Sequence, residues 1–195
     1  MEIYQTSILN MKKIIFPLLL IVAILERTVF DLGPNFEFIT TALVLSAFYL
    51  GKKQSFLLTF LILLISDFIL GNSNIFIFTW SGFLIPALFA SDLIKEIKLN
   101  KILSATGLGI SSNIFFYLWT NFGVWVLDSW GMYPKTIQGL LLSYINGLPF
   151  LKYQITSTLL MLPITFIVFE TVQMIIIQFK SKKTLLTNIK IVSFN

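Results

Sequence analysis

The chain has 195 residues, of which 56% are hydrophobic and only 12% carry a charge. A soluble domain carries about a quarter charged residues, so this chain lacks the polar side chains needed to face water on all sides. It contains no cysteine and no histidine. This excludes disulfide bonds, thiolate chemistry, and proteases that use a histidine as metal ligand or general base. We therefore expect neither a metal site nor a cofactor.

Six apolar stretches, taken in chain order, predict six membrane-spanning helices. They lie at about residues 14–30, 36–50, 55–70, 75–94, 102–127 and 155–179. The second is barely long enough to cross hydrocarbon about 30 Å thick, and the fifth is long enough to tilt or to project from the membrane. The first follows Lys12 and Lys13 and so also fits a secretory signal peptide, but no small-residue cleavage site precedes Glu26-Arg27. Met11 before these lysines is typical of a natural start, so the residues ahead of it are expected to be a dispensable leader.

The stretch between the fifth and sixth predicted helices, residues 129–153, is less apolar and contains several glycines and prolines. We interpret it as an outer loop with a short helix around 137–145. No internal repeat and no second domain is evident. The sequence thus predicts one all-α transmembrane domain over residues 1–195.

The distribution of basic residues predicts that both termini lie in the cytoplasm. With the N-terminus inside and six crossings, 11 of the 14 basic residues fall on the inner side. They are Lys12, Lys13, Lys52, Lys53, Lys95, Lys98, Lys101, Lys180, Lys182, Lys183 and Lys190. Only Arg27, Lys135 and Lys152 fall toward the outside, which agrees with the positive-inside rule. We expect a multi-pass protein of the inner (plasma) membrane, in contact with the lipid bilayer and not with nucleic acid.

All four tryptophans fall in the outer half under this topology. They are Trp80, Trp119, Trp125 and Trp130, and an aromatic belt is expected at that depth.

Ionisable side chains within hydrocarbon need a partner or water, because the charge is costly there. Arg27 in the first helix and Asp67 in the third lie at similar depths near the outer face, so we expect a salt bridge between them. The pair is either a structural clamp or a charged wall of a binding pocket. Glu26 lies close to the outer interface and is expected to be solvated.

The fifth and sixth helices carry polar and small residues that favour close helix packing. Glu170 is expected at the depth of Asn113, so a hydrogen bond from Asn113 or Ser112 to Glu170 would relieve its burial. Ala105, Gly109 and Asn113 recur every four residues, a spacing at which small residues let helix backbones approach. We expect packing within the chain; contact with a partner membrane protein, or for Glu170 a role in ligand binding or proton movement, is the alternative.

Aromatic and amide side chains concentrate at the outer end of the fifth helix and in the stretch after it. The runs are Trp119-Thr120-Asn121-Phe122-Gly123-Val124-Trp125, Tyr133-Pro134 and Tyr144-Ile145-Asn146-Gly147-Leu148-Pro149-Phe150. Aromatic walls with a few amides are typical of a pocket for a small organic ligand. An interfacial belt with turn residues is the other interpretation.

These runs, together with Arg27, Pro34-Asn35-Phe36 and Ser66-Asp67 ahead of Gly71, resemble a family of bacterial membrane proteins of unknown function. The resemblance extends over about residues 25–175. That family is in turn similar to the substrate-binding (S) components of energy-coupling-factor (ECF) vitamin transporters. The likeness implies six helices, a vitamin site near the outer face, and docking onto a transmembrane coupling subunit driven by ATPases. Many S components dock through an Ala-x-x-x-Ala motif on the first helix, where this chain has Ala23 alone.

These observations give eight candidate ligand-binding residues. They are Arg27, Asn35, Asp67, Trp80, Asn121, Trp125, Tyr144 and Asn146. The leading hypothesis is a substrate-binding subunit for uptake of a small, vitamin-like organic nutrient. The chain has no phosphate-binding loop motif and so no ATPase of its own.

The alternative is a structural or assembly subunit of a membrane complex, with no ligand. We do not expect an enzyme, since no nucleophile–base pair is visible and the acidic residues lie at different depths.

Overall fold

The computed structural model describes the backbone of residues 2–30, 32–33, 35–71, 73–96, 100–128 and 131–193, and side chains within these ranges from residue 13 to residue 179. Within these described residues, seven helical elements follow one another. They are α1 (Glu2–Leu25), the short π-helix η1 (Glu26–Phe30), α2 (Ile39–Tyr49), α3 (Lys52–Leu70), α4 (Phe76–Glu96), α5 (Lys101–Leu127) and α6 (Ile137–Ser193). The described part of the chain contains no strand, which confirms the all-α prediction.

Four helices within the described residues are long and apolar enough to cross a membrane. They are α3, α4, α5 and the part of α6 from Ile137 to Phe179. α2 is apolar but has only 11 residues, a length of about 16 Å at 1.5 Å per residue, which is about half of the hydrocarbon thickness. The composition and these four helices agree with a multi-pass membrane protein.

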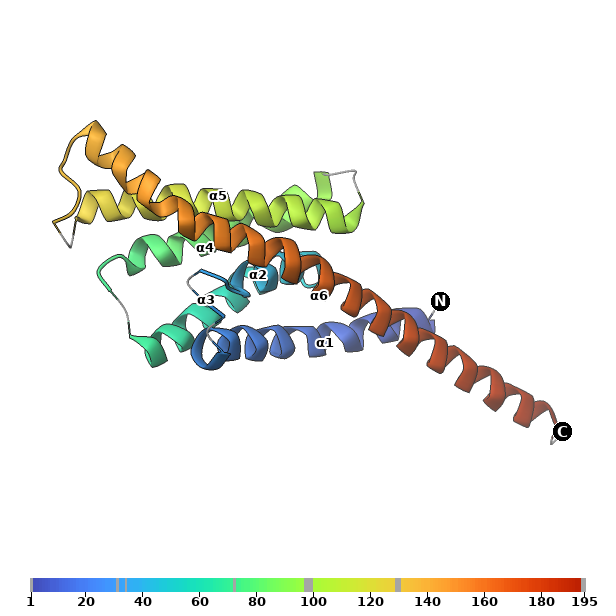
Figure 1. Ribbon diagram of the computed structural model, residues 1–195. Helices are drawn as coiled ribbons and strands as arrows, with labels where there is room; N and C mark the ends of the chain where they lie inside the picture. Colours follow the sequence, from blue (N-terminus) through green and yellow to red (C-terminus); the bar gives the residue numbers. More distant parts are fainter. Residues whose placement is uncertain are drawn as a thin grey trace.

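The bundle has two distinct ends (Figure 1). One end, called here the loop end, carries the α3–α4 connection and the α5–α6 connection at residues 128–136. At the other, called here the terminus end, α1 begins and α6 ends, and α4 connects to α5.

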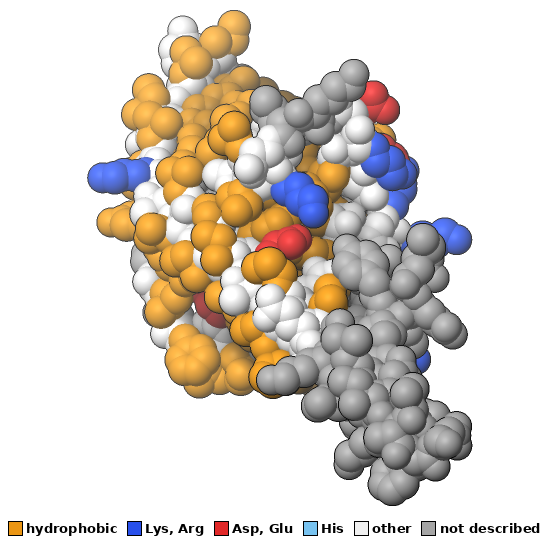
Figure 2. Space-filling view, turned by 90° about the vertical axis from the view of Figure 1, so that its right-hand side faces the viewer, with side chains coloured by type: hydrophobic (Ala, Val, Ile, Leu, Met, Phe, Trp, Pro, Cys, Tyr) orange, Lys and Arg blue, Asp and Glu red, His pale blue; other side chains and the backbone are white. Residues whose placement is uncertain are grey.

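Lysines line the terminus end, around an otherwise largely apolar surface (Figure 2). Lys52 and Lys95 both pair there with Asp92, and Lys101 pairs with Glu170. The side chains of Lys12, Lys98, Lys180, Lys182, Lys183 and Lys190, and Trp130, lie outside the described residues.

The short helix α2 lies at the centre of the bundle and contacts α1, α3, α4, α5 and α6. Every residue from Ile39 to Ala47 is buried. A helix that is apolar on all sides is stable only when other helices surround it. The large apolar side chains on the outside of the bundle, such as Phe68 at 91% exposure, face the region that lipid would occupy.

Local sequence signals account for several helix ends. The Asn100 side chain accepts a hydrogen bond from the Ile102 N–H at 2.9 Å and so caps the start of α5. Gly71, with a φ of +82°, ends α3 in a conformation that side chains with a Cβ rarely adopt. Asp128, also left-handed at a φ of +43°, ends α5.

The predicted outer loop over residues 129–153 is only partly right. Residues 131–136 are not helical and a helix begins at Ile137, as expected, but this helix does not end near residue 145: α6 continues to Ser193 with Pro149 and Pro163 inside it. The glycines that suggested a loop are instead packing positions. A Cβ on Gly139 would lie 2.0 Å from the Pro134 carbonyl oxygen, and one on Gly147 would lie 2.4 Å from the Asn121 amide. Proline is tolerated in membrane helices where neighbouring groups satisfy the freed carbonyl.

Candidate functional site

The predicted salt bridge between Arg27 and Asp67 is confirmed and has a third member. Arg27 Nη2 lies 2.9 Å from Asp67 Oδ1, with side-chain exposures of 18% and 10%. The Trp80 indole donates to Asp67 Oδ2 at 2.6 Å. Asp67 therefore ties η1, α3 and α4 together. A hollow of about 440 Å³ borders the pair on the loop end, with Thr79 and Gly71 in its wall.

The prediction that Glu26 is solvated is wrong, since its exposure is only 7%. Its carboxylate accepts a hydrogen bond from the Phe38 N–H at 3.0 Å, at the start of α2. A carboxylate is favourable there because the first N–H groups of a helix carry a partial positive charge. The chain after η1 folds back so that Phe38 lies beside Glu26. The hydropathy pattern does not predict this contact.

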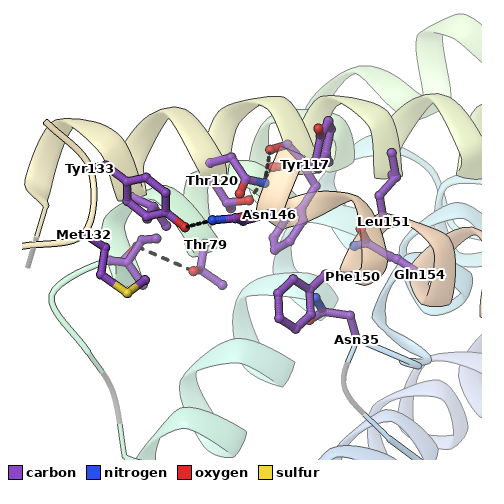
Figure 3. A pocket seen from close by; sticks show the side chains of 15 residues that line it. Asn35, Thr79, Tyr117, Thr120, Met132, Tyr133, Asn146, Phe150, Leu151 and Gln154 are labelled. Carbon is purple, nitrogen blue, oxygen red and sulfur yellow. Dashed lines mark hydrogen bonds between the residues drawn. The ribbon is translucent and has the colours of Figure 1, made fainter. Parts of the chain in front are cut away.

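A second hollow lies between α4, α5 and α6 and extends inward from the loop end (Figure 3). It has a volume of about 520 Å³. Its wall is formed by Asn35, Ile75, Thr79, Phe116, Tyr117, Thr120, Asn121, Val124, Met132, Tyr133, Asn146, Gly147, Phe150, Leu151 and Gln154. A hollow of this size, mostly apolar with a few polar groups, is typical of a small-molecule site.

Helical periodicity brings the wall residues of α6 to one face. Asn146, Phe150 and Gln154 are spaced by four residues, so they follow one another along the hollow (Figure 3). From Asn146 to Gln154 the helix rises about 12 Å. On α5, Tyr117 and Asn121 have the same spacing and face them.

Hydrogen bonds hold the polar wall residues in place. Asn146 Nδ2 donates to the Tyr133 hydroxyl at 3.3 Å, and the Asn121 amide donates to the Tyr117 carbonyl at 2.8 Å. At the inner end, Gln154 Nε2 donates to Glu37 Oε1 at 2.7 Å. Each of these amides is thus oriented by one bond within the protein.

The connection over the loop end of the hollow is pinned rather than free. The Asp128 carboxylate accepts from the Tyr133 N–H at 2.9 Å, and the Trp125 indole donates to the Pro134 carbonyl at 3.0 Å. Lys135 donates to the carbonyls of Trp125 and Val126. These bonds bring Tyr133, which is only 5% exposed, into the wall.

The structure divides the eight candidate residues into three sets. Asn35, Asn121 and Asn146 lie in the wall of the 520 Å³ hollow. A second set, Arg27, Asp67 and Trp80, forms the neighbouring bridge. The third set is outside both: Trp125 holds the α5–α6 connection, and Tyr144 offers its carbonyl to the Tyr117 hydroxyl at 2.7 Å.

Several wall residues were not among the candidates, namely Thr79, Phe116, Tyr117, Thr120, Tyr133, Phe150 and Gln154. Gln154 carried a usable signal, because it follows Asn146 by eight residues and so shares its helix face. Gln154 is missing from the predicted site because the sixth helix was expected to begin only at residue 155, so Asn146 and Gln154 were not placed on one helix. Thr79 lies in the wall of both hollows and so connects the bridge to the larger one.

The predicted hydrogen bond between Asn113 and Glu170 is wrong. The Asn113 amide donates to the Gln154 carbonyl at 3.0 Å and to Thr158 Oγ1 at 2.7 Å, and it accepts from Thr40 Oγ1 at 2.9 Å. Asn113 is fully buried. It therefore joins α2, α5 and α6 directly below the hollow.

Glu170 pairs instead at the terminus end, where it accepts from the Tyr49 hydroxyl at 3.0 Å and lies 3.8 Å from Lys101 Nζ. Lys101 is the first residue of α5 and Asn113 lies about 18 Å farther along that helix. Ser112, the other expected donor, is bonded to the Leu108 carbonyl. The register between α5 and α6, which hydropathy does not specify, caused the error.

The small residues of α5 pack within the chain, as predicted. Ala105 is fully buried, and a Cβ on Gly109 would lie 2.7 Å from Thr158 Cγ2 and 3.1 Å from Leu162 Cδ2. This face is covered by α6 and α2 and is closed to a partner protein.

The chain matches one described protein family over residues 8–181. It belongs to the family of unknown function DUF6580. No curated protein and no solved structure matches the chain. The predicted membership of a family of unknown function is thus confirmed, while the likeness to ECF S components gains no support from these comparisons.

In this DUF6580 member, the described residues contain no group of three or more acidic side chains that could hold a metal ion. The sequence itself has no cysteine or histidine. Chemically, the hollow offers aromatic surface, amides and hydroxyls, which are groups typical of a small-molecule binding site.

Proposed function

We propose that this protein captures a small organic molecule from the outer side of the membrane, as the binding subunit of an uptake system. The observation that carries the proposal is the 520 Å³ hollow, whose wall combines aromatic rings with three asparagines and a glutamine. Three of these four amides, those of Asn121, Asn146 and Gln154, are held by bonds within the protein, so they need little ordering when a ligand binds.

The proposed topology places the loop end outside and both termini in the cytoplasm, with α1 and α2 completing six crossings. Among the described basic side chains, Lys13, Lys52, Lys53, Lys95 and Lys101 belong to the terminus end. The positive-inside rule assigns such an end to the cytoplasm. The hollow then lies where a nutrient arriving from outside would reach it.

Energy for uptake would come from partners, since the sequence has no phosphate-binding loop. The resemblance to S components supports a transmembrane coupling subunit with ATPases in this role. Docking would use a different surface from the alanine motif of that group, because Ala23 is fully buried inside this chain.

The test is native mass spectrometry of the protein purified in mild detergent from membranes of its own host. We expect a bound small molecule that is retained by Gln138→Leu, an exposed α6 position outside the hollow, and lost from Asn146→Leu. A wild-type protein that is always empty, and instead carries other membrane subunits, would contradict the proposal and favour the structural role.

A further inference from the structure

The described residues in the wall of the 520 Å³ hollow include no aspartate, glutamate, lysine or arginine. Its polar groups are four amides (Asn35, Asn121, Asn146 and Gln154) and the hydroxyls of two threonines and two tyrosines. An ionised ligand that leaves water needs an opposite charge or several strong hydrogen bonds in return. None of the described wall residues supplies that charge.

Three acidic groups near the hollow, among the described residues, are each bonded within the protein. Asp67 is held by Arg27 and Trp80, and Glu26 accepts from the backbone at the start of α2. Glu37 accepts a hydrogen bond from the wall residue Gln154 and is not itself among the described wall residues.

On the loop side, the same is true of Asp128 and Lys135. Asp128 accepts from the Tyr133 N–H, and Lys135 donates to two carbonyls at the end of α5. If any of these charged side chains bound a ligand instead, a hydrogen bond or ion pair that holds the site together would break.

The amides, by contrast, retain hydrogen-bonding capacity. One end of the Asn146 amide is bonded to Tyr133 and one end of the Gln154 amide to Glu37, and the other end of each makes no bond to a described residue. The Asn35 side chain makes none at all within the described part of the chain. Asn146 and Tyr133 lie toward one end of the hollow and Gln154 toward the other, with the Phe150 ring between them (Figure 3).

From this distribution we infer that the hollow selects an uncharged, flat molecule with hydrogen-bonding groups at both ends and an apolar middle. The inference rests on the proposed capture function and names its substrate class. The free amide ends would bind the polar groups, and Phe150, Phe116 and Tyr117 supply aromatic surface for the middle.

The first test identifies the molecule released when protein purified from host membranes is denatured, by liquid chromatography and mass spectrometry. A compound that is neutral at pH 7 supports the inference. A carboxylate, a phosphate, an ammonium compound or a phospholipid alone would overturn the substrate class while leaving a binding protein. An empty protein overturns the proposed function and the inference with it.

The second test uses probes of one shape and different charge: benzamide, benzoate and benzylamine, with thermal stabilisation in detergent as the readout. Wild-type protein should bind benzamide at least about tenfold more tightly than either ion, because only the neutral compound avoids burying an unpaired charge. Asn146→Asp places a carboxylate in the wall at nearly constant shape and should shift the preference toward benzylamine. Gln138→Glu is the matched control outside the hollow and should keep the wild-type order.

Wild-type binding of benzoate or benzylamine in preference to benzamide would overturn the neutral class. An Asn146→Asp protein that folds, and keeps the wild-type order of the three probes, would show that this amide does not face the ligand.

Discussion

Removing the Asp67 carboxylate should destabilise the protein more than any change at a surface ion pair. Asp67→Ala leaves the Arg27 guanidinium, 18% exposed, without its partner at 2.9 Å and the Trp80 indole without its acceptor at 2.6 Å. Breaking one partner of a buried pair costs about 3–5 kcal/mol. Because this pair is partly exposed, we expect about 3 kcal/mol, at the lower limit of that range.

Graded variants separate the contributions. Trp80→Phe removes one hydrogen bond to a charged group and keeps the ring, so it should cost about 1.5–3 kcal/mol. The double variant Arg27→Met with Asp67→Leu removes both charges together, and it should be more stable than Asp67→Ala alone because no unpaired charge remains.

The assay is equilibrium unfolding in mixed micelles with a denaturing detergent, followed by far-ultraviolet circular dichroism, for the complete double-mutant cycle. The exposed pair Lys52–Asp92 at the terminus end, with exposures of 45% and 53%, is the control. Asp92→Ala should change stability far less than Asp67→Ala, because water screens an exposed pair. Additivity of the Arg27 and Asp67 substitutions to within about 0.5 kcal/mol would refute the reasoning, because contacting residues that stabilise each other do not add.

Three further outcomes are expected. Gly147→Ala should cost about 1–3 kcal/mol in the same unfolding assay, since its Cβ would lie 2.4 Å from the Asn121 amide and displace it from its hydrogen bond to the Tyr117 carbonyl. Asn113→Leu should cost about 2–4 kcal/mol, because it strands the polar groups of α2 and α6 that Asn113 joins; an unchanged unfolding curve would contradict this. The chain has no cysteine, so Asn74→Cys should react with a membrane-impermeant maleimide in intact cells and Lys53→Cys only after the membrane is opened; the reverse pattern would invert the proposed topology.

The sequence predicts which charged side chains pair when the order of the helices is enough to fix their depth in the membrane. Arg27 and Asp67 were matched correctly because alternate crossings place both near the same face. The expected partner of Glu170 was wrong, since it depended on the register between α5 and α6. A shift of helix register changes every contact along it while leaving the hydropathy unchanged.

The glycines and the proline in the stretch after α5 show a second limit of prediction from a single sequence. In sequence, Gly139, Gly147 and Pro149 favour a loop. In the structure, the two glycines lie where a neighbouring carbonyl or amide leaves no space for a Cβ, and the proline is inside α6. Whether a glycine ends a helix or permits close packing depends on what lies opposite, which a single sequence does not contain.

The sequence by itself determined the all-α class, the apolar helices, the asymmetry of basic charge and the absence of cysteine and histidine chemistry. These are properties of composition and order, which do not depend on how helices face one another. The tertiary structure decided which amides share a cavity, because Asn35, Asn121 and Asn146 come from three separate segments. It also decided that the charged side chains near this cavity, those of Asp67, Glu26 and Glu37, are bonded within the protein. Such pairing depends on distances that only the packed bundle sets.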